Sequence, residues 1–300
     1  MELLPGGPGA VMKADCHIHM VLDGGYWRTA MDRHSHAPDD SFIHAALAAY
    51  SGRGFTHLRD GGDKYGAGAR AKALAPEYGI EYLTPLFPIH KVGHYGGFIG
   101  RGFEMLGQYR DLVAQVRAGG GDFIKIMISG LMDFDHFGVL SPPPLEKPLI
   151  REMIHIAHEE GFAVMAHANG ADTVLAAVEA GVDSVEHGAY LNDEALAAMA
   201  ERGAVWVPTL STIGNLPGTG RFDDSQVELI LESALSNVER FASLGGLVAC
   251  GSDAGAFAVP HDLGAESEMR HLRRALGDRC EALADAGNRE IFRRFRPWAK

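Results

Sequence analysis

The stretch that decides the fold runs from Phe162 to Val207 and reads FAVMAHANGADTVLAAVEAGVDSVEHGAYLNDEALAAMAERGAVWV. Short apolar runs, which are typical of buried strands, alternate in it with segments whose apolar residues recur at helical spacing. The predicted strands are Phe162–Ala166, Val182–Val185 and Ala204–Val207, and the predicted helices between them are Ala171–Ala180 and Asp193–Arg202. Strands that alternate with helices in this way are typical of βα units around a parallel sheet.

The same alternation extends outward in both directions. The further predicted strands are Ala10–Asp15, Phe55–Arg59, Ile80–Phe87, Phe123–Ile128 and Leu247–Cys250. The further predicted helices are Phe42–Tyr50, Ala67–Tyr78, Glu104–Arg117, Leu149–Glu160, Ser225–Leu244, Glu266–Ala275 and Arg279–Phe295. Eight strand-then-helix units in 300 residues predict an α/β fold, a (β/α)8 TIM barrel that forms a single domain over residues 1–300.

A doubly wound open sheet gives similar local patterns and is the main rival fold. It needs a glycine-rich nucleotide fingerprint at its first βα turn, and here the first strand runs into Asp15-Cys16-His17-Ile18-His19 instead. The sequence therefore favours the barrel.

Composition limits the class of partner. Lys and Arg number 27 against 39 Asp and Glu, so the formal net charge is −12, and 46% of the residues are hydrophobic. This balance is typical of a soluble globular protein and excludes the basic surface that nucleic acids or anionic membranes require. The N-terminal MELLPGGPGA lacks the pattern of a signal peptide, and three cysteines indicate no disulfide framework, so we expect a cytoplasmic protein.

Polar residues gather at the ends of the predicted strands, which in a barrel meet at the catalytic face. These residues are His17, His19, Lys125, His167, His187 and Asp253. A single histidine of this kind is more often a core residue, and the His-x-His spacing recurs at His34 and His36 in a polar segment. On a strand, however, residues two apart point the same way, so both rings of the first pair can face the barrel axis.

Lys125 is the most informative of these residues. In FIKIMI it shares a strand face with Phe123 and Met127, and a buried unpaired ammonium is costly. Lys125 either pairs with an acid such as Asp253 or loses its charge. A neutral amine can react with CO2 to form a carbamate, whose two oxygens can bridge two metal ions.

Five motifs in order, DCHIHM, FIKIMISG, VMAHANG, SVEHGAYL and CGSDAG, resemble the amidohydrolase superfamily of metal-dependent hydrolases. The similarity is strongest to its imidazolonepropionase-related and Xaa-Pro dipeptidase-like branch. The resemblance implies two divalent metal ions, usually Zn²⁺. It places His17, His19 and Asp253 on the first metal and His167 and His187 on the second, with carboxylated Lys125 bridging both. The identity and number of the metals stay open at this point.

The resemblance also implies a mechanism. A hydroxide that bridges the metals attacks a carbonyl carbon, while Asp253 takes its proton and passes it to the leaving nitrogen. His94 and Tyr190 match residues that contact the carbonyl oxygen in the dipeptidase-like branch. Without the resemblance, His94 is interpreted as a mobile loop residue and Tyr190 as a packing residue beside a helix.

Several features depart from the family or keep no assigned role. Relatives usually carry a small β-sandwich on both sides of the barrel, and neither half is recognisable here, so we expect no separate second domain. Arg59 and Asp60 either pair with each other or bind a substrate carboxylate, and the ion pair is the simpler interpretation. The pleat should turn Cys16 and Cys250 away from the site, and neither receives a role.

The function expected from these observations is hydrolysis of an amide or peptide C–N bond in a small molecule such as a dipeptide, an N-acyl amino acid or a cyclic amide. A lactonase, esterase or phosphotriesterase that uses the same metal pair is the alternative within the class. A barrel that binds metal or a ligand without turnover is the alternative outside it. A mononuclear deaminase is disfavoured because that pattern lacks the bridging lysine. Assembly into a homo-oligomer stays open.

Overall fold

Two parallel sheets form the centre of the chain in the computed structural model, which describes residues 11–296. The strands are β1 (Ala14–Ile18), β2 (His57–Asp60), β3 (Glu81–Leu83), β4 (Ile89–Lys91), β5 (Arg101–Phe103), β6 (Ile124–Met127), β7 (Leu131–Met132), β8 (Leu140–Ser141), β9 (Val164–Ala168), β10 (Ser184–His187) and β11 (Val205–Val207). The α-helices are α1 (Trp27–Asp32), α2 (Asp40–Gly52), α3 (Ala67–Leu74), α4 (Leu106–Ala118), α5 (Lys147–Glu159), α6 (Ala171–Glu179), α7 (Asp193–Arg202), α8 (Ser211–Gly214), α9 (Asp224–Ser243), α10 (Gly264–Leu276) and α11 (Cys280–Arg294).

Backbone hydrogen bonds join the two sheets into a barrel. The strand orders are β1-β2-β3 and β11-β10-β9-β6-β4-β5, with every neighbouring pair parallel. The Asp122 amide, just before β6, donates to the Thr84 carbonyl, just after β3, at 2.9 Å. On the other side, the Trp206 amide donates to Leu247 and the Cys16 amide donates to Cys250, both at 2.8 Å. The predicted α/β barrel is therefore confirmed.

The element boundaries differ from the sequence prediction in a few places. The predicted eighth strand, 247–250, forms only an isolated bridge between Val248 and Trp206. The predicted helix Ala67–Tyr78 is α-helical only to Leu74 and continues as a 3₁₀ turn, because Pro76 has no amide hydrogen to donate. The short strands β4 and β5, the antiparallel pair β7–β8 and the helices α1 and α8 were not predicted.

The interpretation of residues 1–10 as lacking a signal peptide, and the predicted strand start at Ala10, lie outside the described residues.

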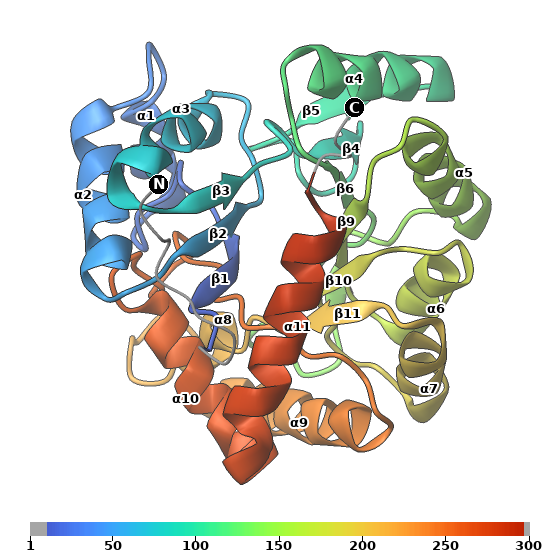
Figure 1. Cartoon of the computed structure of the whole chain (residues 1–300). Helices are drawn as coiled ribbons and strands as arrows, with labels where there is room; N and C mark the ends of the chain where they lie inside the picture. The colour runs from blue at the N-terminus through green and yellow to red at the C-terminus, as the bar shows by residue number, and fades with distance from the viewer. Residues whose placement is uncertain (1–10, 297–300) are drawn as a thin grey trace.

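The strand around Lys125 shows how the sequence alternation builds the core. Ile124 and Ile126 pack outward against the helices, whereas Phe123 packs inside the barrel with Met165 and Val207. Figure 1 shows α11 lying across the strands inside a ring of the other helices. Phe292 of α11 and Phe295, just after it, belong to the interior cluster. They cover the end of the barrel at which the strands begin.

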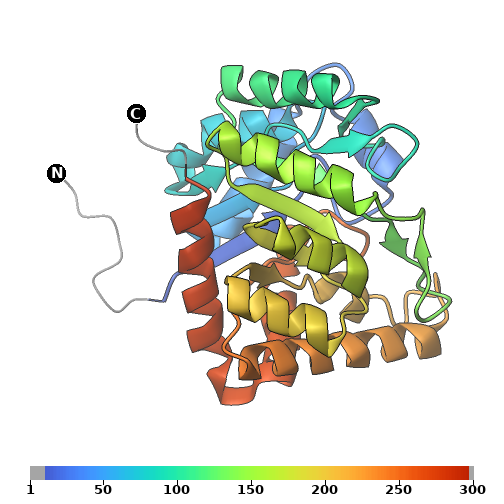
Figure 2. The ribbon, with the colours of Figure 1, turned by 90° about the vertical axis from the view of Figure 1, so that its right-hand side faces the viewer.

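The opposite end of the barrel carries the longer loops. In Figure 2, α11 stands at one end of the strands and the β7–β8 hairpin at the other. Catalytic groups of such barrels sit at the carboxyl ends of the strands, so the hairpin end is where a site is expected. Within the described chain, no helix has the length and apolar character needed to cross a membrane.

Candidate metal centre

The residues predicted to hold metals lie at the carboxyl ends of the strands, except Lys125, which lies within β6. They come from β1 (His17, and His19 just after it), β6 (Lys125), β9 (His167), β10 (His187) and the turn after residues 247–250 (Asp253). A cavity of about 400 Å³ opens there, and five of the six line it. The sixth, His17, is fully buried directly behind it. The structure thus brings together the whole predicted set.

Three ligand atoms converge at the first predicted metal position. His17 Nε2 lies 3.4 Å from His19 Nε2, and Asp253 Oδ1 lies 3.5 and 3.4 Å from these two nitrogens. Tetrahedral zinc with bonds of about 2.0–2.1 Å holds its ligand atoms about 3.3 Å apart, so this spacing fits a metal ion.

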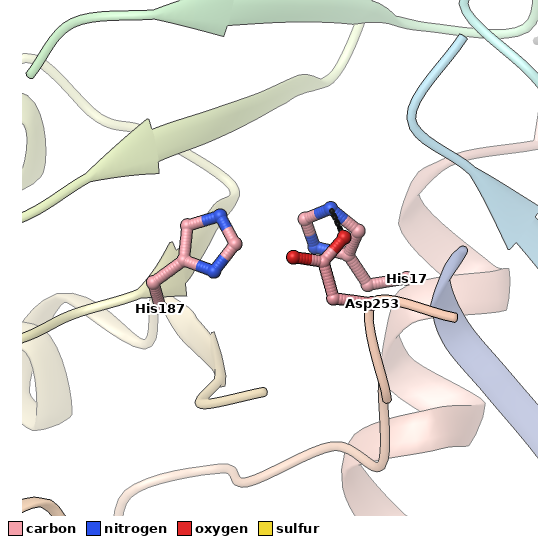
Figure 3. Close-up of side chains that lie close together, drawn as sticks. All are labelled: His17, His187 and Asp253. Atoms are coloured by element: carbon pink, nitrogen blue, oxygen red, sulfur yellow. Dashed lines mark ion pairs between the residues drawn. The ribbon is translucent and has the colours of Figure 1, made fainter. Parts of the chain in front are cut away.

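His187 belongs to the same group of side chains. Its ring faces the Asp253 carboxylate across a gap, with His17 beside that carboxylate (Figure 3). One ligand atom from each of these three residues lies within 4.8 Å of the other two. The His167 ring is 4.5 Å from the His187 ring, centroid to centroid, which places the second predicted pair next to the first set.

Hydrogen bonds fix which nitrogen of each ring is free to bind a metal. The Nδ1–H of His17 donates to Glu186 Oε2 at 2.7 Å, which leaves Nε2 as the acceptor atom. The Nε2–H of His167 donates to the Gly130 carbonyl at 3.1 Å, which leaves Nδ1. His187 Nδ1 shares a hydrogen bond with Thr209 Oγ1 at 2.7 Å, so its Nε2 is free. Such partners orient imidazole ligands in metal sites.

The electrostatics keep these imidazoles neutral. Burial, reinforced by the Lys125 charge, lowers the pKa of His19 and of His167 to about 3. Burial likewise holds the pKa values of His17 and His187 well below their usual range. A neutral imidazole offers the lone pair that a metal ion needs.

The Lys125 amine is buried without a hydrogen-bond or ion-pair partner in the described structure. Lys125 is 1% exposed, and its Nζ has no hydrogen-bond partner and forms no ion pair among residues 11–296. Burial lowers its pKa to about 8. Pairing with Asp253, the plainer interpretation of the sequence, is therefore absent from the described structure. Asp253 Oδ1 and His19 Nδ1 are also buried without hydrogen-bond partners.

These orphaned atoms fit a metal pair. Buried polar groups are normally paired, so the unpartnered Lys125 amine and Asp253 Oδ1 in one cavity require an explanation. Two cations and a carbamate on Lys125 would satisfy both groups, whereas a metal on His19 Nε2 would leave His19 Nδ1 without a partner.

The backbone at two of the ligands is held in an unusual conformation. His187 (φ 67°) and Asp253 (φ 59°) both lie in the left-handed region, which side chains other than glycine seldom adopt. Such conformations cluster at functional sites, where the surrounding structure enforces them. The backbone also packs tightly against His19. A Cβ at Gly61 would lie only 2.3 Å from His19 Cε1, so a larger residue does not fit there.

Arg59 corrects one prediction. It does not pair with Asp60 but crosses the barrel interior to Glu186. Its Nη2 donates hydrogen bonds to both carboxylate oxygens of Glu186, at 2.8 and 3.0 Å. Asp60 instead accepts from the Met20 and Gly62 amides. Because Glu186 also holds His17, Arg59 lies behind the candidate metal centre and does not line the cavity. Glu186 was missed, although an acid inside the apolar run SVEH is the same kind of indicator as Lys125.

The two predicted contacts to the carbonyl oxygen do not line the main cavity. His94 is half-buried and its Nδ1 lies 3.3 Å from the Pro143 carbonyl, whereas the next residue, Tyr95, lines the cavity 4.8 Å from the His167 ring. The Tyr190 ring meets the Phe137 ring edge to face, and Tyr190 lines a smaller adjoining cavity with His187. Their catalytic roles stay predictions.

The two cysteines beside the site point away from it. Cys16 Sγ lies 3.4 Å from Asn288 Oδ1 on α11. Cys250 Sγ lies 3.9 Å from the Ala265 carbonyl on α10. The strand pleat therefore turns both side chains toward the surrounding helices, as predicted.

A barrel with these candidate metal ligands near the carboxyl ends of its strands defines a class of protein. Comparison with known families identifies that class. The model of the amidohydrolase family matches residues 8–285, so the chain belongs to the amidohydrolase family.

Individual relatives share only part of their sequence with this chain, or share it at low identity. Ochratoxinase of Aspergillus niger is 26% identical over 279 residues, which cover 80% of this chain and 56% of the ochratoxinase sequence. An uncharacterized protein of Mycobacterium tuberculosis is 39% identical over 70 residues, only 23% of this chain and 19% of that protein. The chain thus spans about half or less of these relatives.

Solved structures show the same fold. A Xaa-Pro dipeptidase with bound methionine aligns with a TM-score of 0.76 at 18% identity, over 94% of this chain and 75% of the other. Crystalline A. niger ochratoxinase aligns with a TM-score of 0.75 at 19% identity, over 95% and 71% of the two chains.

Proposed function

We propose that this chain is a metal-dependent hydrolase that cleaves an amide or peptide C–N bond in a small molecule, with two divalent metal ions, zinc in the first instance. The observation that carries the proposal is the buried Lys125 amine. Among residues 11–296 it has no hydrogen-bond partner, although four imidazoles and Asp253 lie near it. The names of the similar structures, a Xaa-Pro dipeptidase among them, support a C–N bond as the target.

The six predicted residues would hold the metals. His17, His19 and Asp253 would bind one ion, His167 and His187 the other, and Lys125, carboxylated by CO2, would bridge both. When bound, the metals supply Lewis acidity that activates water and polarises a carbonyl oxygen.

Asp253 is the residue proposed to move the proton. In the metal-free chain, burial raises the pKa of its carboxyl to about 7. Its place in the cavity lets it accept a proton from a water and release that proton to a leaving group. In the proposed reaction it takes a proton from the attacking water and delivers it to the leaving nitrogen. This use requires that its second oxygen face the cavity, which Asp253 lines.

His94 and Tyr190 are proposed to contact the carbonyl oxygen of the substrate. Both lie on loops at the cavity end of the barrel, and Tyr190 lines the smaller adjoining cavity with His187. His94→Ala and Tyr190→Phe should each lower kcat more than they raise KM if this role holds. Unchanged kcat in both variants would contradict it.

The experiment that tests the function is a hydrolysis screen with the zinc-loaded chain. Dipeptides, N-acyl amino acids and cyclic amides are assayed beside lactones, esters and phosphotriesters, and we expect turnover of a C–N bond that chelation abolishes. Asp253→Asn should keep bound metal yet lower kcat at least about 100-fold, the usual share of a general acid–base group. Turnover of esters or phosphotriesters alone would overturn the choice of bond, and no turnover at all would favour a binding protein.

A further inference from the structure

The cavity above the metal ligands is walled mainly by aromatic and aliphatic side chains. Its rings are Trp27, Tyr95, Phe98, Phe134, Phe222 and Phe257. A volume of about 400 Å³ is that of a site for a small molecule with a sizeable apolar body. The apolar walls alone, however, do not explain a charged residue at the same cavity.

Arg221 is that charged residue. Its guanidinium carbon lies 4.3 Å from the centre of the Phe257 ring and 5.2 Å from that of Phe222. It is exposed, and it forms no ion pair within the part of the chain that the structure describes. Apart from Arg221, the only cationic side chain lining the cavity in the described residues is Lys125.

The nearby acids are already engaged. Asp223 accepts from the amide and hydroxyl of Ser225, and Asp224 accepts from the Gly218 amide. Arg221 is therefore held by two rings and leaves its hydrogen-bond donors available. A guanidinium in this state matches a carboxylate, which it can bind through two parallel hydrogen bonds.

Arg221 is also connected to the catalytic loop. Phe257 follows Asp253 by four residues, directly after a turn that the hydrogen bond from the Ala256 amide to the Asp253 carbonyl closes at 2.9 Å. The ring that supports the guanidinium thus comes directly after the turn of the proposed proton carrier, and Arg221 and Asp253 line the same cavity.

We infer that Arg221, supported by Phe222 and Phe257, is a carboxylate-binding subsite, and that the substrate is an amide with an apolar body and a free carboxylate. The inference rests on the proposed amide hydrolysis. The net charge of −12 repels anions in general, so a preference for a carboxylate has to come from a local cation such as this one.

The test compares two ligands that differ only in charge, N-benzoyl-L-leucine and N-benzoyl-L-leucinamide. Binding is measured by isothermal titration calorimetry on the zinc-loaded chain in the Asp253→Asn background, in which hydrolysis does not consume the ligand. We expect the acid to bind about tenfold more tightly than the amide, the lower end for a charge-assisted pair because Arg221 is exposed.

Arg221→Met should remove this preference, and Arg221→Lys should keep part of it. The matched control is Arg28→Met, because Arg28 stacks on Trp27 at 4.7 Å but does not line the cavity. It should leave the preference intact. Equal binding of acid and amide, no binding of either, or an equal loss in the Arg28 variant would overturn the inference.

Turnover by the wild-type chain separates the two proposals. If the acid binds through Arg221 but no amide of the screen is hydrolysed, the proposed function fails and the subsite stands. If amides are hydrolysed with no preference for the carboxylate, the subsite fails and the function stands.

Discussion

Glu186→Gln removes the carboxylate that connects His17 to Arg59 inside the barrel. In the wild-type chain its two oxygens accept hydrogen bonds from Arg59 Nη2 at 2.8 and 3.0 Å, from Ser184 Oγ at 2.5 Å and from His17 Nδ1 at 2.7 Å. An amide has only one oxygen. If that oxygen faces Arg59, the NH2 group faces His17 and forces its proton onto Nε2, the atom meant for the metal.

The magnitude follows from burial. Arg59 and Glu186 are both completely inaccessible to solvent, so the variant leaves an unpaired cation in the core. Breaking such a buried pair costs about 3–5 kcal/mol of unfolding free energy. Losing the partner that orients a metal-binding imidazole lowers metal affinity about 10–100-fold.

Urea denaturation and zinc titration measure the two effects. The control is Glu281→Gln, which removes an Arg273 ion pair of comparable length (2.6 Å) on the exposed surface and should leave both measurements unchanged. If Glu186→Gln denatures at the wild-type urea concentration and binds zinc with wild-type affinity, the proposed support of His17 by Glu186 is refuted.

Three further perturbations test other parts of the structure. Lys125→Met should bind fewer than two zinc ions per chain by elemental analysis, because the bridging amine is gone, and full occupancy would contradict the bridge. Gly61→Ala should lower zinc occupancy, because the new methyl group takes the place of the His19 ring, whereas unchanged occupancy would show that His19 is not a ligand. Burial raises the pKa of Glu268 to about 8 from 4.5, so the folded chain keeps a proton that the unfolded chain loses. The stability of wild type relative to Glu268→Gln should therefore fall as pH rises from about 4.5 to 8, by several kcal/mol, and a difference that does not vary with pH in urea denaturation would contradict this.

The sequence predicted what depends on local pattern. Helical spacing and capping residues located α9, and the structure confirms that the Asp223 side chain accepts from the Ser225 amide at its start. Strand alternation correctly placed Lys125 on the inner face of β6 between Phe123 and Met127. These features follow from neighbours along the chain, which a single sequence displays.

What the sequence did not predict depends on contacts between distant segments. Arg59 and Glu186 are 127 residues apart, and only closure of the barrel brings β2 opposite β10. Tyr95 replaces His94 at the cavity because of the path of a glycine-rich loop, which residue pattern does not determine. The eighth strand shrinks to a bridge because its segment pairs by only a few hydrogen bonds with β11 and β1.

The central claim is that two metal ions lie between the four imidazoles, Asp253 and a carboxylated Lys125. The most direct measurement is an anomalous difference map at the zinc absorption edge, from crystals grown with zinc and bicarbonate. The account predicts two peaks, one beside His17, His19 and Asp253 and one beside His167 and His187, with density for a carbamate on Lys125 between them. A map with no peak in this cavity, or with metal bound while the Lys125 amine stays unmodified and apart from it, would contradict the account.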